Sequence, residues 1–214
     1  DKPATGKSGK HAIACPKNFE DSLIISDPRP PLHLLRRIYL ESNHASIAEV
    51  ERRCLTSREY NALRYSLGIA EGLGEFCSLK SLPTQYNYDF LGGIDFEKGC
   101  YLGQELTRRT HFLGSTRRRI VPFLIDDSQN VSHDRYLKYS AASADDNIAV
   151  YESDTQRCVG ELVALEGSHG LVMHRFLHEV RKYPKSMSAF CTLHGSKVNL
   201  QIFRPDWWPE SYSE

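Results

Sequence analysis

The chain has 214 residues, 40% of them hydrophobic, and its 27 Lys and Arg residues are balanced by 27 Asp and Glu residues. This size and apolar content exclude a wholly disordered chain and allow one large or two small domains. The balance of charge excludes a general attraction to nucleic acid or to an anionic membrane, so any basic site must be local. No apolar run approaches the roughly 20 residues of a membrane span, and no signal or transit segment is visible. Because the chain starts at Asp1 and not at Met, we expect a fragment or a processed product.

The cysteines are far apart in the sequence and form no C-x-x-C pair or Cys/His cluster of the kind that binds zinc or a resident iron–sulfur cluster. We therefore predict mostly reduced thiols. A disulfide framework is the alternative for an even number of cysteines, but it is typical of short secreted domains. The six residues are Cys15, Cys54, Cys77, Cys100, Cys158 and Cys191.

The first 20 residues are rich in Lys, Gly, Pro and Ser, which predicts a flexible lead-in. A short apolar strand is expected at 23–25, ended by Asp27 and a proline. A second strand is expected at 34–40, after a Pro-rich turn.

From residue 46 to 67 the apolar spacing becomes helical, and Ser57 is a candidate N-cap for the second part of this stretch. Gly68 would end the helix. Residues 70–97 carry no sustained period and predict an irregular segment. A short helix is then expected over 102–112, closed by Gly114.

Beyond residue 114 the chain changes to short strand-prone runs separated by turn signals, which predicts a small antiparallel barrel or sandwich. The predicted domain boundary lies near residue 114. The predicted strands include 119–125, 148–151, 159–165, 170–173 and 198–203.

The most informative stretch is KGCYLGQE, residues 98–105. It predicts a tight turn that leads into a helix beginning near Gly103, with Gly99 and Gly103 allowing the backbone to approach another group. Cys100 would then lie beside a helix N-terminus and near Lys98, and both features favour its thiolate. The alternative is that Cys100 is a small residue buried at a crowded turn.

These residues match the K-G-C-Y-x-G-Q-E signature of the YgfZ-type folate-binding proteins at every fixed position. Three further segments agree. RYSLGIAEG (64–72) resembles the family's R-x-x-x-G-x-P-E-G element, with Ala70 in place of Pro. LPTQYN (82–87) resembles its L-P-x-E-x-N element. PDWWP (205–209) resembles the tail of the mitochondrial, CAF17-type members.

The resemblance implies an α+β fold, the C-terminal part of a glycine-cleavage T-protein-like (aminomethyltransferase) folate-binding body followed by a small antiparallel β-barrel. In these terms residues 1–20 are the lead-in, 21–114 an incomplete C-terminal half of the folate-binding domain, and 115–209 the barrel with its Trp-rich tail. Because family members have many residues before the point that corresponds to Asp1, we expect an incomplete folate pocket.

Transferred position by position, the resemblance makes Cys100 the functional thiol and a candidate bridging ligand of a transient iron–sulfur cluster. No other metal ligand is predicted. A tetrahydrofolate site is implied, although Gln85 replaces the family's Glu and loses the charge that strengthens a paired hydrogen bond to a pterin. The candidate cofactor-binding residues are Gln85, Asn87, Lys98, Gly99, Tyr101, Gly103, Gln104 and Glu105.

Five arginines near the end of the signature form a basic cluster, for which two interpretations stay open. It is either a solvated face or a docking surface for an acidic partner protein or a folate polyglutamate tail. The residues are Arg108, Arg109, Arg117, Arg118 and Arg119.

Two smaller features complete the set. His174 and His178 have the i, i+4 spacing of two metal ligands on a helix, but no third ligand lies nearby in the sequence. Trp207 and Trp208 are expected to pack the C-terminal tail onto the body.

The leading hypothesis is an assembly factor of the mitochondrial matrix that helps to mature 4Fe–4S proteins. Its expected partners are A-type iron–sulfur scaffold proteins and the 4Fe–4S target proteins, with no nucleic acid partner. The alternative on the same fold is a tetrahydrofolate-dependent aminomethyltransferase or other one-carbon transferase, whose sequences lack the thiol signature. A third hypothesis is an inactive splice product or partial gene product.

Overall fold

The computed structural model describes residues 22–29, 31–32, 34–39, 55–76, 81–112, 116–126, 138–140, 147–175 and 186–209. The chain divides into two compact units, residues 1–54 and 55–214. Among the described residues, no helix combines the length and apolar character needed to cross a membrane. The predicted lead-in, the first part of the 46–67 helix, Gly114 and His178 lie outside the described residues.

The first unit contains the two predicted strands as one antiparallel hairpin. Strand β1 (Ser22–Ser26) pairs with β2 (Leu35–Tyr39), in a register that places Ser26 opposite Leu35. The Asp27 carboxylate accepts hydrogen bonds from Arg29 Nη2 at 2.7 Å and Arg36 Nε at 2.8 Å. Burial alone would raise the pKa of Asp27, but these hydrogen bonds hold it well below its ordinary value. The turn of the hairpin is therefore closed by a buried carboxylate.

The second unit begins with helix α2 (Ser57–Ser66), whose N-cap is Thr56. The Thr56 hydroxyl accepts from the Glu59 amide, and the Glu59 carboxylate accepts from the Thr56 amide, which is a complete capping box. The prediction of Ser57 as N-cap is therefore wrong by one residue. Gly68 ends the helix as predicted, with φ +73° and its amide bonded to the Tyr65 carbonyl.

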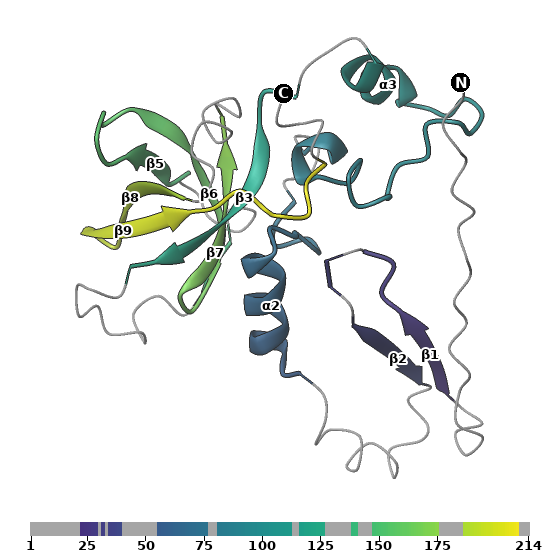
Figure 1. The fold of residues 1–214 in the computed structure, drawn as a ribbon, viewed down its shortest axis with the longest axis horizontal. Helices are drawn as coiled ribbons and strands as arrows, with labels where there is room; N and C mark the ends of the chain where they lie inside the picture. The colour runs from purple at the N-terminus through teal and green to yellow at the C-terminus, as the bar shows by residue number, and fades with distance from the viewer. Residues whose placement is uncertain are drawn as a thin grey trace. The chain divides into compact units, whose positions relative to one another are not determined.

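Six antiparallel strands close into a barrel (Figure 1). Around the barrel the order is β6-β5-β8-β9-β3-β7, and β7 pairs back to β6. A short seventh strand, β4, pairs with the C-terminal half of β6. The strands are β3 (Arg119–Ile125), β4 (Lys138–Ser140), β5 (Ala149–Glu152), β6 (Cys158–Glu166), β7 (His169–His174), β8 (Met187–Leu193) and β9 (Ser196–Ile202). The predicted small antiparallel barrel is confirmed, including its five proposed strands to within about two residues.

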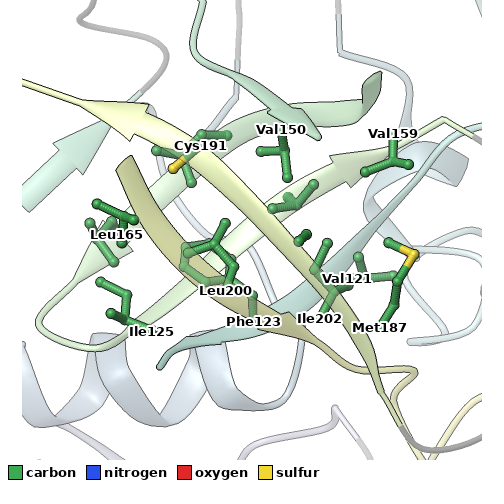
Figure 2. Packing of buried hydrophobic residues seen from close by; sticks show 14 of the residues in the cluster. Val121, Phe123, Ile125, Val150, Val159, Leu165, Met187, Cys191, Leu200 and Ile202 are labelled. Carbon is green, nitrogen blue, oxygen red and sulfur yellow. The ribbon is translucent and has the colours of Figure 1, made fainter. Parts of the chain in front are cut away.

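Aliphatic side chains from all six ring strands fill the barrel interior. Figure 2 shows Val121, Leu200 and Ile202 among them, and each is at most 1% exposed. Gly170 lies opposite Phe123 in the β3–β7 pair, and a Cβ atom on Gly170 would come within 2.3 Å of the Phe123 ring. The absent side chain of Gly170 therefore makes room for the phenyl group.

A second apolar cluster covers the outside of the barrel. Tyr65 of α2, Ala70 and Tyr86 pack against Ile120 of β3 and Leu171 of β7. Strands β3 and β7 are therefore buried on both faces, so their sequences read as almost continuous apolar runs. The predicted domains 21–114 and 115–209 stay a prediction, because this packing fits either one domain or an interface between two.

The C-terminal tail packs on the second unit, as predicted. Trp208 is buried in the barrel cluster and meets the Phe90 ring edge-on at a centroid distance of 5.8 Å. The Trp207 indole N–H donates to the Leu67 carbonyl at 2.8 Å. The tail thus joins the end of α2 to the barrel.

Two features were not predicted correctly. His174 lies fully buried at the end of strand β7, so the idea of a helical His174–His178 metal pair is wrong. Strands β4 and β8 were not among the predicted ranges. Strand β8 could have been found, because apolar residues recur at every second position along it, and all of them are buried: Met187, Ala189, Cys191 and Leu193.

Gly170→Ala tests the barrel packing. Since the added methyl would overlap the Phe123 ring, we expect unfolding free energy in urea to fall by about 1 to 3 kcal/mol. Gly99→Ala is the matched control, because no atom of the described residues lies within 4 Å of its Cβ position, and it should change the stability by less than about 1 kcal/mol. Equal stability of the two variants would contradict the packing.

Candidate functional site

The segment before the signature is fixed to the barrel through Asn87. The 3-10 helix η3 (Pro83–Tyr86) ends at Asn87, which has φ +62° and a fully buried side chain. The Asn87 amide donates from Nδ2 to the Ile120 carbonyl at 3.0 Å and accepts at Oδ1 from Arg119 at 3.3 Å. Both ends of this amide are therefore used in the fold.

Arg119 is the centre of the same buried network. Its guanidinium forms a two-pronged ion pair with Asp89, at 2.8 and 2.7 Å, and its side chain is only 2% exposed. Arg119 also donates to the Thr84 carbonyl at 2.6 Å and lies 3.9 Å above the Phe90 ring. One arginine of β3 thus holds four residues of the 84–90 segment. We call this network, which consists of Thr84, Asn87, Asp89, Phe90 and Arg119, the Arg119 lock.

These contacts correct two predictions. Arg119 does not belong to an exposed docking cluster, because its charge is buried and paired. Asn87 is committed to the fold and is not free to hold a cofactor. Gln85 is half-buried, and its backbone N–H donates to the Leu82 carbonyl.

The predicted thiol lies on an exposed loop, residues 92–103. Cys100 is an exposed free thiol, so the alternative of a thiol buried in a crowded turn is wrong. The Asp95 carboxylate accepts from the amides of Glu97 and Lys98, which shapes the turn before it. The ammonium of Lys98 lies 4.5 Å from the Tyr101 ring centroid. The structure thus places Lys98, Cys100 and Tyr101 on one accessible loop.

The two signature glycines lie in open space, so the predicted close approach of another group stays a prediction. Within the part of the chain that the structure describes, no atom lies within 4 Å of a Cβ position at Gly99 or Gly103. Gly103 instead has φ +87°, a conformation that favours glycine. Its role is to turn the chain into the following helix.

Helix α3 (Gln104–Phe112) begins where predicted. Gln104 is buried, and its Nε2 atom has no hydrogen-bond partner among the described residues. Glu105 is exposed and pairs with Arg109 at 3.8 Å, a weak surface contact. His111, in the last turn, stacks on Phe96 at a centroid distance of 3.7 Å, which joins the loop to the helix.

The other four predicted arginines are exposed. Arg108 lies over the Phe112 ring at 5.4 Å, and Arg117 and Arg118 precede the buried Arg119. A basic surface therefore remains, with Arg119 removed from it.

Arg64 and Tyr65 of the RYSLGIAEG element form a second buried network with Glu75. Arg64 donates to both Glu75 carboxylate oxygens, at 3.0 and 2.8 Å, and the Tyr65 hydroxyl donates to the same carboxylate at 2.7 Å. Burial would lower the pKa of Arg64, but the hydrogen bonds and charge of Glu75 raise it above its ordinary value. Burial and the Glu75 charge raise the pKa of Tyr65. The element is thus a structural brace between α2 and the turn at Glu75.

A cavity of about 310 Å³ opens beside η3. It is lined by Phe76, Ser81, Leu82, Pro83, Tyr86 and Tyr88. Its aromatic walls suit a flat ring, but Gln85 and Asn87 do not line it, and the Asn87 amide is occupied. Gln85 and Asn87 thus lie outside the lining of this cavity, and the folate site stays a prediction.

The other described thiols differ from Cys100. Cys191 is buried in the barrel, and burial raises its pKa to about 12, so it stays protonated near neutral pH. Cys158 is half-buried on β6. Within the described ranges, no group of three or more His, Cys, Asp or Glu residues is placed to hold a metal ion.

Sequence reasoning missed the carboxylates that organise the site. Asp89 and Glu75 each pair with a buried arginine, and neither was singled out. Asp89 had a weak signal, since it follows LPTQYN by only two residues in a segment of apolar and aromatic residues. Its partner is 30 residues away, so only the fold could identify it.

Comparisons with known proteins agree with the barrel. Residues 117–210 match the family model described as CAF17, C-terminal beta-barrel domain. This match covers the barrel and the tail, which are less than half of the 214 residues.

Curated relatives extend the similarity upstream. The human protein named iron–sulfur cluster assembly factor IBA57, mitochondrial, is 33% identical over 151 residues, covering 71% of this chain and 38% of the human protein. The Mus musculus protein of the same name is 29% identical over 188 residues, covering 88% and 48%. A Dictyostelium discoideum homolog is 40% identical over 105 residues, covering 48% and 26%. The chain therefore spans less than half of the length of these relatives.

The Arg119 lock predicts that alanine substitutions at two neighbouring arginines lower the free energy of unfolding by unequal amounts. Arg119→Ala leaves the Asp89 carboxylate buried and unpaired, so we expect a loss of about 3 to 5 kcal/mol of unfolding free energy. Arg118→Ala, one residue earlier and exposed, should change it by less than about 0.5 kcal/mol. Urea unfolding of both variants measures the two free energies of unfolding. Similar losses in the two variants would contradict the buried ion pair.

Proposed function

We propose that this chain is part of a mitochondrial iron–sulfur cluster assembly factor that supports the maturation of 4Fe–4S proteins. The observation that carries the proposal is the exposed Cys100 thiol, on a loop that the Arg119 lock joins to a barrel. That barrel matches the CAF17 C-terminal barrel model. The names of the relatives support the same function and a mitochondrial location, which we assign to the matrix.

In this proposal the iron–sulfur cluster is cargo, and Cys100 is one of its ligands. Clusters are commonly held by four cysteine thiolates, and the loop offers one. The remaining ligands would come from a partner protein, so the cluster would be shared at an interface. An A-type scaffold protein is the proposed partner, and 4Fe–4S proteins are the proposed targets.

The fold explains how one exposed thiol can serve in a shared site. Leu91 is buried and ends the segment held by Asn87 and Arg119, and the exposed loop begins at Gly92. Helix α3 follows the loop, and the Phe96–His111 stack joins the two. The thiol is thus accessible to a protein partner while both ends of its loop are attached to ordered structure.

The aminomethyltransferase alternative is not proposed, because the names of the relatives do not favour it. The T-protein-like body of residues 21–114 stays a prediction. Tetrahydrofolate remains a proposed ligand of this T-protein-like body. The aromatic cavity beside η3 supports this proposal.

Cys100→Ala tests this function in cells that lack the endogenous factor. The full-length protein should restore mitochondrial 4Fe–4S enzyme activity, whereas Cys100→Ala should leave it near the level of the empty vector, because the cargo loses a ligand. Cys158→Ala is the matched control and should restore activity fully, since its half-buried thiol lies on the barrel. Protein levels must be equal. Full rescue by Cys100→Ala would reject the role of the thiol, and no rescue by the wild-type protein would reject the function.

A further inference from the structure

Three aromatic rings connect the loop that carries the thiol to the last turn of helix α3. The His111 ring stacks on the Phe96 ring at a centroid distance of 3.7 Å, with 13° between the two planes. The Phe112 ring meets both of them edge-on, at 4.8 Å from His111 and 6.0 Å from Phe96. Each aromatic pair adds stability beyond the area that it buries. We call these three residues, Phe96, His111 and Phe112, the aromatic clasp.

The aromatic clasp closes a ring of chain that contains Cys100. Cys100 follows Phe96 by four residues, and His111 lies further along the chain at the end of α3. Within the described part of the chain, the other hydrogen bonds, ion pairs and ring contacts of residues 97–110 join residues at most four positions apart. The clasp is therefore the contact that holds the two distant ends of this stretch together.

The loop has anchors at its two ends and none in its middle. At the start, the Gly93 amide donates to the Tyr88 carbonyl at 2.8 Å, within reach of the segment that Arg119 holds. At the other end, helix α3 contacts η3, and Gln104 is its buried residue. Residues 97–103 between these anchors are all exposed. Because this stretch has no side chain in a core, its conformation depends on the contact that closes it.

We propose that His111 is a positioning residue for the Cys100 thiol, because its stack on Phe96 fixes the loop relative to helix α3. This inference rests on the proposed function, in which Cys100 supplies one ligand of a cluster shared with a partner. A shared site needs each ligand at a defined place. A loop that presents its thiol there for only a fraction of the time binds more weakly by that fraction. His111 thus acts through the loop and not on the cluster.

Electron paramagnetic resonance of a nitroxide attached to Cys100 in the full-length protein measures the mobility of the loop. The signal of labelled Cys100→Ala is subtracted, which removes label on other thiols. We expect His111→Ala to raise the ratio of mobile to immobile label by about two- to tenfold, the factor that corresponds to one aromatic pair. His111→Phe should keep the wild-type spectrum, because a phenyl ring also stacks on Phe96.

Leu106→Ala is the matched control for the spectra. Leu106 lies on the same helix, is 43% exposed and takes no part in the aromatic clasp, so this variant should keep the wild-type spectrum.

Loss of the His111 ring should leave the fold intact. None of the three clasp residues belongs to either buried apolar cluster, and alanine has a higher helix propensity than histidine. Urea unfolding of His111→Ala should therefore give the wild-type free energy of unfolding, so that a changed nitroxide spectrum reports on the loop.

Rescue of 4Fe–4S enzyme activity in cells that lack the endogenous factor supplies the functional readout. At equal protein levels His111→Ala should restore less activity than the wild type, and His111→Phe should restore as much. Phenylalanine has no nitrogen, so rescue by His111→Phe separates positioning of the thiol from direct binding of the cluster by the imidazole.

The outcomes separate this inference from the proposed function. An unchanged nitroxide spectrum in His111→Ala would overturn the inference, and so would a failure of His111→Phe to retain the spectrum or the activity. If the wild type and His111→Ala restore activity equally, the function stands and the positioning role is wrong. If the spectra change as expected but the wild-type protein restores no activity, the proposed function is wrong and the role of the clasp in holding the loop stands.

Discussion

Arg119 and Asp89 form a buried ion pair on which the arrangement of the candidate site depends. Two charges removed from water are stable only when their hydrogen bonds are satisfied, and here the guanidinium meets the Asp89 carboxylate, the Thr84 carbonyl and the Asn87 amide. Because these groups lie on the segment that leads into the signature, the pair sets where the thiol loop leaves the barrel. The barrel holds the segment in place, and the proposed chemistry lies on the loop.

A second buried ion pair joins Arg64 and Glu75. It braces the end of α2 against the turn at Glu75, and the Glu75 carbonyl accepts a hydrogen bond from the Tyr86 hydroxyl of η3. Polar networks therefore secure the segment before the loop at several points. The loop itself has few such contacts, and its polar and apolar side chains face solvent. An exposed loop of this kind is suited to recognition by another protein, since its exposed side chains are not needed to hold the fold.

The sequence predicted the barrel well, because short apolar strands and turn signals are local features. It also predicted the helix that follows Gly103 and the packing of the Trp-rich tail. It failed where the answer depends on contacts between distant residues. Arg119 was grouped with its exposed neighbours, yet the fold pairs it with Asp89, and Asn87 was assigned to a ligand, yet the fold uses its amide. The exposure of Leu102 and Leu106 was not anticipated either.

Hydrogen–deuterium exchange of the full-length protein tests the central claim most directly. The claim is that the exposed thiol loop follows a segment, residues 84–90, whose conformation Arg119 fixes. The amides of Asn87, Tyr88, Phe90 and Leu91 are hydrogen-bonded within the segment that Arg119 holds. They should exchange as slowly as those of the barrel strands, through the same global unfolding, whereas amides between Gly99 and Gly103 should exchange rapidly. Exchange of residues 87–91 at the rate of the loop would contradict the account, because the buried pair would then not fix the segment that carries the thiol.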